Sequence, residues 1–392
     1  MAQSVLNQKL VEAEFPRTAD AIYLNTGSNG RKPISVLHTI NDAWGRLNIN
    51  PTLSTFLDPE PWLKAREACA RVLQVPAKSV LITQSTTQGL HLIMHSFLLK
   101  AGDELVTTNH EHGSLNTIAR YLEETRGIIV RRCEVHPDAG SSAFSLGILD
   151  LITERTKLVA LSEIGSYTGW RPDISSLTES LALLEVPLLV DGAHVAGQVW
   201  TEASRYPLWV GSAHKWLGAP NGTGFAYVAP NLVSRLEPVW LGDQFFNLRD
   251  NDWQDLSRFE SMGTSDVVRL EALAQACELY LQLTPEAVAQ RQFELVDYAR
   301  RRLAQELNPT FRTPPLSDIL YKTAMLTFFF SPQRLQVKDL REALWQRHKI
   351  WVQPDFINSN PATGMRISCH YSVQESDIDA LILALKTVIN DG

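Results

Sequence analysis

The sequence predicts an α/β protein: a large domain with a mostly parallel sheet and helices on both faces, followed by a smaller α+β domain. Three observations support this fold class. From about residue 65, short apolar runs alternate with helical patterns, an order typical of βαβ units. The run Leu189-Val190 ends in Asp191, as expected for a buried inner strand of a parallel sheet. At 392 residues, the chain also exceeds the size at which one hydrophobic core stops growing, so we expect two domains.

The predicted elements alternate between strand and helix along the large domain. Strands are expected at 80–83, 104–108, 128–135, 157–162, 189–191, 208–210 and 225–228. Helices are expected at 87–99, from about 114, and at 174–184. The small domain is expected to contain a helix at 268–283, a strand at 324–330, a strand around Arg366 and a closing helix at 375–389. The resulting division is an N-terminal segment 1–20 that packs against the small domain, a large domain 21–265 and a small domain 266–392.

Composition limits the possible classes of function. The net charge of −7 and the absence of a basic tail argue against a general nucleic-acid-binding protein. No basic segment precedes an apolar one near the N-terminus, and no apolar run is long enough to cross a bilayer, so neither a signal peptide nor a membrane span is expected. The four cysteines lack CxxC spacing, which favours free thiols in a cytoplasmic protein over a disulfide framework or a zinc site. The expected function is chemistry on a small molecule.

Two residues at the expected ends of neighbouring strands carry the main chemical argument. Asp191 closes one apolar run, and the run 208–210 leads into His214 and Lys215. The carboxyl ends of parallel strands meet at one edge of a sheet, where open α/β folds bind their ligands. An aspartate that keeps a pyridine nitrogen protonated and a lysine that forms a Schiff base are the two protein groups that pyridoxal phosphate (PLP) requires. The pair therefore predicts a PLP site.

A cluster of hydroxyl side chains is expected where the strand 80–83 is followed by a helix. Ser85, Thr86 and Thr87 lie at this junction. The first turn of a helix offers unpaired backbone N–H groups and the positive end of the helix dipole, which together bind phosphate. The alternative is simple N-capping of the helix by Ser85 or Thr86. The position of the cluster, at the same edge as the aspartate and the lysine, favours a phosphate site.

Histidines accumulate at the same predicted edge. His112 follows a strand, at a point where a flat imidazole can stack on a pyridine ring. With His110 it also forms a His-x-His pair, which is compatible with a metal site, and either side chain can instead be purely structural. His194 and His214 extend the cluster, and the aspartate at the strand end would complete a set of metal ligands. A metal requires neither Lys215 nor the hydroxyl cluster, however, so PLP explains more of the pattern.

Arg366 lies in the expected strand of the small domain, within 364–371. A planar guanidinium suits bidentate binding of a substrate carboxylate. An exposed arginine without a ligand is the alternative, because most arginines lie on the surface.

Taken together, these segments resemble the class V aminotransferase family of fold-type I PLP enzymes. This family includes cysteine desulfurases, the cyanobacterial cysteine/cystine C–S lyase and isopenicillin N epimerase. The resemblance extends from about Ile22 to the C-terminal helix. It depends on the order and spacing of the segments 23–27, 85–87, 111–112, 191–194, 212–215, 258–260, 263–264 and Arg366. It implies a seven-stranded, mostly parallel sheet and a homodimer whose subunits share their active sites.

The resemblance also implies a role for each matching position. Lys215 would carry PLP as a Schiff base and later move the Cα proton, and Asp191 would pair with the pyridine nitrogen. His112 would stack on the ring, and His194, which stands where relatives often have Gln, would approach the phenolic oxygen. The PLP phosphate would be held by Ser85, Thr86, Thr87, Ser212 and His214, together with Thr264 of the partner subunit. The substrate carboxylate would be bound by Arg366 and Asn25.

One difference from the family pattern argues against cysteine desulfurase activity. Cysteine desulfurases carry a nucleophilic cysteine on a loop just before the segment equivalent to 351–356, and this stretch contains no cysteine here. Cys369 lies on an expected strand, where a structural thiol is favoured over a mobile nucleophile. The segment 366–371 is similar to that of the C–S lyase, whereas His194 and the segment 215–217 are similar to those of the epimerase group.

We therefore expect a C–S lyase that releases pyruvate, ammonia and a sulfur product from cysteine, cystine or an S-substituted cysteine. The alternatives within the family are an epimerase of the isopenicillin N type and a cysteine desulfurase. Outside the family, the histidine cluster leaves a metal-dependent hydrolase or a cofactor-free binding protein as alternatives. The expected partners are an amino-acid substrate and a second copy of the chain, without nucleic acid or membrane.

Overall fold

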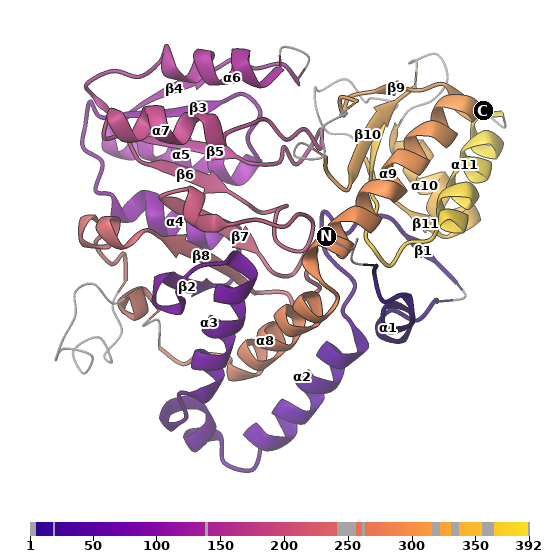
Figure 1. Cartoon of the computed structure of the whole chain (residues 1–392), viewed down its shortest axis with the longest axis horizontal. Helices are drawn as coiled ribbons and strands as arrows, with labels where there is room; N and C mark the ends of the chain where they lie inside the picture. Colours follow the sequence, from indigo (N-terminus) through magenta and orange to yellow (C-terminus); the bar gives the residue numbers. More distant parts are fainter. Residues whose placement is uncertain are drawn as a thin grey trace.

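The computed structural model describes residues 5–390 except 19, 138–139, 241–255, 261–262, 316–321, 331–336 and 355–363. Its large domain contains a seven-stranded sheet in the order β2-β8-β7-β6-β5-β3-β4. The strands are β2 (Val80–Thr83), β3 (Glu104–Thr108), β4 (Ile129–Cys133), β5 (Thr156–Ser162), β6 (Leu188–Asp191), β7 (Leu208–Ser212) and β8 (Gly224–Val228). Strand β8 is antiparallel to both neighbours, and the others run in one direction (Figure 1). The predicted seven-stranded, mostly parallel sheet is confirmed.

Helices cover both faces of this sheet. Leu188 and Val190 of β6 join the core on one face, whereas Leu189 joins the core on the other. The first core is shared with α3 (Glu60–Leu73), α6 (Gly140–Leu149), α7 (Ser175–Leu183) and α8 (Val267–Gln282). The second core is shared with α4 (Thr86–Ser96) and α5 (Gly113–Arg126). Burial on both faces explains why the inner strands are continuously apolar.

Two helices that the sequence pattern did not predict project from the sheet. These are α2 (Ile34–Leu47) and α3, and both pack against α8 (Figure 1). In α2, Val36, Ile40, Ala43 and Leu47 recur at helical spacing on the side that faces the core, whereas Leu37 and Trp44 beside this stripe are exposed. Short helical turns complete the domain: η1 (Leu53–Leu57), η2 (Ala77–Ser79), η4 (Ala203–Arg205), η5 (Pro230–Arg235) and η7 (Leu256–Phe259).

The small domain contains a four-stranded antiparallel sheet in the order β12-β13-β10-β9. Its elements are α9 (Pro285–Leu307), β9 (Thr310–Phe311), β10 (Met325–Phe329), α10 (Val337–His348), β12 (Gln353–Pro354), β13 (Gly364–Ser368) and α11 (Glu375–Asn390). Within the pair β12–β13, Gln353 lies opposite Arg366. This register places a polar side chain beside the expected carboxylate-binding arginine.

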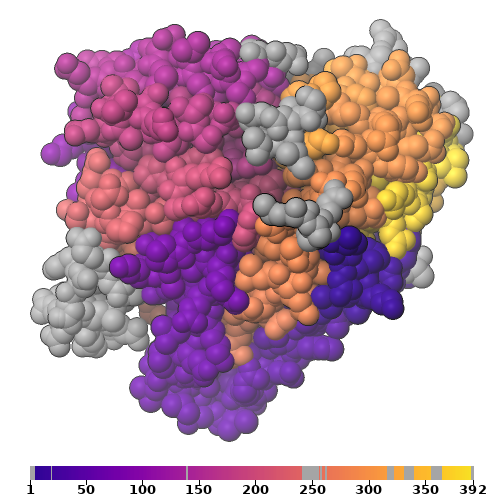
Figure 2. Space-filling model, viewed as in Figure 1, coloured from indigo at the N-terminus to yellow at the C-terminus, as the bar shows by residue number. Residues whose placement is uncertain are grey.

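The N-terminal segment lies against the small domain. Strand β1 (Ile22–Tyr23) pairs in parallel with β11 (Ile350–Trp351). The preceding helix α1 (Gln8–Glu14) ends at Phe15, whose ring meets those of His370 and Tyr371 edge-on, with centroids 5.3 and 5.6 Å away. Figure 2 shows this segment, in indigo, between the orange and yellow surfaces of the C-terminal half. No helix in the described ranges is both long and apolar enough to cross a membrane.

Candidate active site

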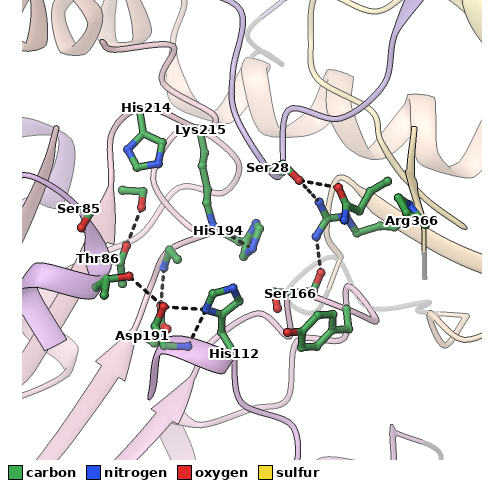
Figure 3. A pocket seen from close by; sticks show the side chains of 18 residues that line it. Ser28, Ser85, Thr86, His112, Ser166, Asp191, His194, His214, Lys215 and Arg366 are labelled. Atoms are coloured by element: carbon green, nitrogen blue, oxygen red, sulfur yellow. Dashed lines mark hydrogen bonds between the residues drawn. The ribbon is translucent and has the colours of Figure 1, made fainter. Parts of the chain in front are cut away.

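A cavity of about 470 Å³ lies at the carboxyl edge of the large sheet, where it meets the segment between β1 and α2 and the small domain (Figure 3). Open α/β sheets bind ligands at this edge, and the volume lies within the usual range for small-molecule sites. The predicted residues that line the cavity are Ser85, Thr86, Thr87, His112, Asp191, His194, Ser212, His214, Lys215 and Arg366. The structure thus brings most of the predicted site together, but Asn25 and Thr264 do not line it.

Asp191 and Lys215 reach the cavity from neighbouring strands. Asp191 ends β6 and is only 4% exposed, and its Oδ1 accepts a hydrogen bond from the backbone N–H of Ala193 at 2.9 Å. Lys215 follows the end of β7. Burial raises the pKa of Asp191 and lowers the pKa of Lys215 to about 8, because both charged forms lose hydration. A buried carboxyl group and a readily deprotonated amine therefore line the same space.

Hydroxyl groups gather at the end of the cavity beside α4. Thr86 Oγ1 and Ser212 Oγ are 2.7 Å apart, which joins the first turn of α4 to the end of β7. Thr87 Oγ1 lies 2.9 Å from Ser114 Oγ. Ser85 caps α4, because its side chain accepts a hydrogen bond from the backbone N–H of Gln88 at 3.1 Å. Capping and anion binding are compatible here, since the first turn also presents N–H groups without intrahelical partners.

His214 is held at this end by the turn 220–224. Its Nδ1 lies 3.0 Å from the carbonyl oxygen of Thr223. A carbonyl oxygen only accepts, so Nδ1 carries the proton and the neutral ring presents an unprotonated Nε2. Burial lowers the pKa of His214. Nε2 can therefore donate to a phosphate only when the ring is doubly protonated, a form that the negative charge of the phosphate would stabilise.

His112 is fixed by the helix that follows it and by the residue before it. It is the N-cap of α5, and its Nδ1 accepts from the backbone N–H of Ser114 at 3.1 Å. The buried Glu111 accepts from Thr108 Oγ1 at 2.6 Å and from the backbone N–H of Ser162 at 2.7 Å. Burial raises the pKa of Glu111 to about 7. Glu111 therefore ties the ends of β3 and β5 together and holds the loop that carries His112.

His110 takes no part in the cavity. Its Nε2 lies 2.6 Å from Thr168 Oγ1, and its ring meets that of Trp170 edge-on. Burial lowers the pKa of His110 to about 4. The structural role considered for this histidine agrees with these contacts. Among the described residues, no three His, Cys, Asp or Glu side chains are grouped in a way that would hold a metal ion.

Arg366 forms the opposite end of the cavity, where three parts of the chain meet. It is 5% exposed on β13, and its Nη1 donates to the carbonyl oxygen of Ser166. Its Nη2 donates to Asn25 Oδ1 at 3.2 Å and to Ser28 Oγ at 3.1 Å. Arg366 Nε and Ser166 Oγ are buried without a hydrogen-bond partner in the described part of the chain. Buried polar groups are costly when unpaired, so this corner suits a ligand rich in acceptors, such as a carboxylate.

Asn25 supports this corner from behind. It receives the Arg366 hydrogen bond on Oδ1, and its Nδ2 donates to Gln353 Oε1 at 3.1 Å. Because guanidinium nitrogens only donate, this chain of contacts fixes the orientation of both amides. Asn25 thus contacts two residues that line the cavity without lining it itself, and the direct carboxylate contact expected from the resemblance stays a prediction. Thr264 is exposed, outside the cavity of its own subunit.

Sequence reasoning missed several residues that line the cavity. These are Ser28, Ser114, Ser166, Tyr167 and Gln353. Ser166 and Tyr167 follow the end of β5, so the rule that located the other strand-end residues also applies to them. No sequence pattern pointed to Gln353, because it reaches the cavity only through its pairing opposite Arg366 in the small sheet.

Comparison with known proteins decides the family. The model of the family described as Aminotransferase class-V matches residues 22–381. The chain belongs to the class V aminotransferase family. Among curated relatives, isopenicillin N epimerase of Streptomyces clavuligerus is 27% identical over 386 residues, covering 94% of this chain and 95% of that protein. A probable cysteine desulfurase of Halalkalibacterium halodurans is 26% identical, covering 72% of each.

Solved structures of this class share the fold of the chain. The cystine C–S lyase C-DES, in complex with its product cysteine persulfide, superposes with a TM-score of 0.82 at 22% identity, covering 94% of this chain and 97% of its own. The apo cysteine desulfurase from Thermococcus onnurineus NA1 superposes with a TM-score of 0.85 at 18% identity and full coverage of both chains. The fold-type I architecture expected from the resemblance is confirmed.

PLP is the cofactor of this class V enzyme. The cavity contains the chemical groups that this cofactor requires: a lysine amine, a buried aspartate, and a hydroxyl cluster at a helix N-terminus. The orphaned polar atoms at Arg366 and Ser166 lie at the other end, where an amino-acid substrate would present its carboxylate. The residues present therefore fit PLP together with a small amino acid.

Proposed function

We propose that this class V enzyme cleaves a carbon–sulfur bond in cysteine, cystine or an S-substituted cysteine. In this α,β-elimination, Cα loses a proton, the Cβ–S bond breaks, and the thiolate leaves with the bonding electron pair. Water then converts the remaining three-carbon enamine to pyruvate and ammonia. One observation carries the proposal: the cavity joins a proton-accepting lysine to a carboxylate-binding corner, and all four cysteines of the chain are buried outside it.

Different residues along the cavity bind the substrate, move the proton and stabilise the bound cofactor. Bound PLP supplies an electron sink for the charge that develops at Cα. Arg366 and the hydroxyl of Ser166, whose Oγ has no partner among the described residues, hold the substrate carboxylate at one end. Lys215, as a neutral amine, takes the proton from Cα, and its pKa, lowered to about 8, makes this form more available near neutral pH than in an ordinary lysine. Asp191 lies buried at the strand end and provides the negative charge that keeps the pyridine nitrogen protonated.

Transfer of sulfur to an enzyme cysteine is disfavoured. Cys69, Cys133, Cys277 and Cys369 are all buried. The pKa of Cys369 is raised to about 12 by burial, so it is not a reactive thiolate. Residues 355–363, which precede β13 in the sequence, lie outside the described residues and include no cysteine. Sulfur therefore leaves in the product.

A specific observation favours an epimerase as the second candidate. Tyr167 lines the cavity with its ring nearly parallel to that of His112, at a centroid distance of 6.2 Å. Epimerisation needs a proton donor on the face of Cα opposite the base, and a phenol can provide that proton. The relatives named isopenicillin N epimerase, 27% identical over most of the chain, support the same reaction.

A substrate screen separates the two reactions. The purified enzyme is incubated with cystine or an S-substituted cysteine in deuterated water, and pyruvate and deuterium at Cα are measured. Pyruvate that disappears in Lys215→Ala and persists in Tyr167→Phe supports the lyase. Inverted, deuterated amino acid without pyruvate, lost in both variants, would establish epimerisation and overturn the lyase proposal. Neither product from any sulfur amino acid would also overturn it.

A further inference from the structure

His194 lies between the cavity lysine and a buried tryptophan. Its Nε2 is 3.3 Å from Lys215 Nζ, and its Nδ1 is 3.4 Å from Trp216 Nε1 (Figure 3 shows His194 beside Lys215). His194 is 3% exposed, and Trp216 is fully buried. Both ring nitrogens of the histidine are therefore engaged by protein groups, away from bulk water.

The chemistry of the indole determines which nitrogen of His194 carries the proton. An indole N–H donates and has no lone pair to accept with, so His194 Nδ1 must be the acceptor in this contact. Burial lowers the pKa of His194 well below its usual range, and the positive charges of Lys215 and Arg366 lower it further. The ring is therefore neutral and carries one proton. That proton must be on Nε2, the nitrogen that faces Lys215.

A protonated Nε2 can approach the lysine only as a donor. An ammonium group has three N–H donors and no acceptor, so the contact requires the lone pair of a neutral nitrogen at Nζ. The other charged or titratable groups that act on this pair are Asp191, Arg366 and His112. Of these, Asp191 alone favours the ammonium form. His194 opposes it by presenting a donor.

We infer that Trp216 is a positioning residue that fixes His194 in the Nε2-protonated form, so that His194 donates a hydrogen bond toward the nitrogen of Lys215. Without the indole N–H, the neutral His194 ring could take either tautomer, and Nε2 could be a donor or an acceptor toward Lys215. The indole leaves only the tautomer in which Nε2 is the donor. This inference rests on the proposed role of Lys215 but not on which reaction follows.

The tryptophan is itself held in place from the small domain. His370 Nε2 lies 3.3 Å from the carbonyl oxygen of Trp216, so the histidine donates to it. The ring of His370 also stacks over that of Trp216, with a centroid distance of 6.4 Å. On the other side, Gln198 Nε2 donates to the carbonyl oxygen of His194 at 2.6 Å. These contacts fix both backbones, so the two rings keep their relative orientation.

The proton position can be measured without turnover. The holoenzyme is labelled with ¹⁵N-histidine, and two-bond ¹H–¹⁵N correlations report which ring nitrogen of each histidine is protonated. The His194 signals are assigned by their absence from His194→Gln. We expect the Nε2-protonated form in the wild type and a shift toward the Nδ1-protonated form in Trp216→Phe.

The chain offers a matched control. Trp209 is also fully buried, and its Nε1 has no hydrogen-bond partner among the described residues. Trp209→Phe thus removes a buried indole without removing a hydrogen bond to a histidine. This variant is expected to leave the His194 signals unchanged, which separates loss of the N–H group from general loosening of the core.

A second readout is the pH titration of the absorption band of bound PLP. Loss of the fixed donor lets His194 accept from the lysine nitrogen, so Trp216→Phe should raise the midpoint by about one pH unit. His194→Gln should keep the wild-type midpoint, because one amide can accept from the indole and donate toward Lys215 at once. His194→Leu should not keep it.

Two results would overturn the inference. One is a wild-type His194 with its proton on Nδ1. The other is a Trp216→Phe variant that matches Trp209→Phe in both the NMR signals and the titration midpoint. Neither result bears on the lyase proposal, which the pyruvate assay decides separately.

Discussion

Asp191 and Lys215 show how burial prepares single residues for chemistry. Burial raises the pKa of the carboxyl and lowers that of the amine, so each shift moves the residue toward its neutral form. A protonated pyridine nitrogen beside Asp191 reverses the first shift, because an opposite charge favours the carboxylate. The amine, in contrast, remains ready to react without a proton. The same low dielectric thus serves two different roles.

The Asp191→Asn substitution tests the first role. The amide keeps the size of the side chain and can still accept from the backbone N–H of Ala193, so we expect PLP to remain bound. We expect turnover to fall on the order of a hundredfold, the usual effect of removing a preorganised charge from an active site. Cofactor content from absorbance and initial rates of product formation measure the two effects. Turnover near the wild-type value would contradict the assignment.

The pKa of Lys215 can be checked through the loading of apo-protein with PLP. Only the neutral amine attacks the PLP aldehyde, and a pKa lowered to about 8 makes this form available at lower pH. The loading rate should therefore rise about tenfold per pH unit and level off above pH 8, whereas an ordinary lysine would not level off until above pH 10. Stopped-flow absorbance gives the rate, and Lys215→Ala is the blank. A rate that keeps rising through pH 10 would refute the shift.

At the scale of elements, the segment between β1 and α2 closes over the loop that carries Lys215. The backbone N–H of Gly30 donates to the carbonyl oxygen of His214 at 2.9 Å. Lys32, whose pKa burial lowers to about 8, donates to Asn29 Oδ1 at 2.9 Å and to the carbonyl oxygen of Gly30 at 2.7 Å. These contacts leave no room for a side chain at Gly30.

The Gly30→Ala substitution is expected to separate the segment from the lysine loop. A Cβ there would overlap the backbone carbonyl oxygen of Lys215, which cannot rotate away as a flexible side chain can. We expect a loss of about 1–3 kcal/mol in the free energy of unfolding, together with weaker PLP binding. Gly45→Ala, inside α2 with nothing within 4 Å of the new methyl, should instead gain up to about 1 kcal/mol.

Urea unfolding and PLP titration measure both variants. Equal stability of the two alanine variants would contradict the close packing at Gly30.

The sequence predicts two strands of the large sheet with their observed bounds, for a physical reason. The strands Val80–Thr83 and Glu104–Thr108 were predicted with their observed bounds, because short apolar runs with sharp ends are typical of buried parallel strands. Helix α9 also carries a local pattern, because its buried residues Val288, Leu295, Ala299 and Leu303 recur at helical spacing between charged residues. The local sequence pattern was therefore sufficient to place strands that are buried on both faces.

The same distinction applies to the site. Asp191 and Lys215 could be placed because the ends of parallel strands share one edge. Gln353 and Ser28 could not, because they reach the cavity only through the docking of the small domain and of the segment between β1 and α2. Likewise, the support role of Asn25 depends on its tertiary hydrogen bonds to Arg366 and Gln353. Tertiary contacts of this kind leave no local pattern in the sequence.

At the scale of the whole molecule, one guanidinium connects the three parts that form the site. Arg366 of the small domain is hydrogen-bonded to Ser166, which follows β5, and to Asn25 and Ser28, which lie between β1 and α2. The carboxylate corner therefore exists only when these parts are docked. At the opposite end, Ser85 and Thr87 also border a second hollow, lined in addition by His91, His95, Val239 and Trp240. Ser85 and Thr87 thus line both hollows.

We expect a second copy of the chain to complete the end of the cavity beside α4. Thr264 is exposed and outside its own cavity, which is the position required if it reaches the phosphate end of the partner's site. Sedimentation equilibrium should then give twice the chain mass of 43.9 kDa. Thr264→Ala should weaken PLP binding about tenfold, which corresponds to one hydrogen bond to a charged group. Ser265→Ala, the neighbouring hydroxyl, is the control. A monomeric holoenzyme, or equal PLP affinity in the two variants, would show that each subunit forms its site alone.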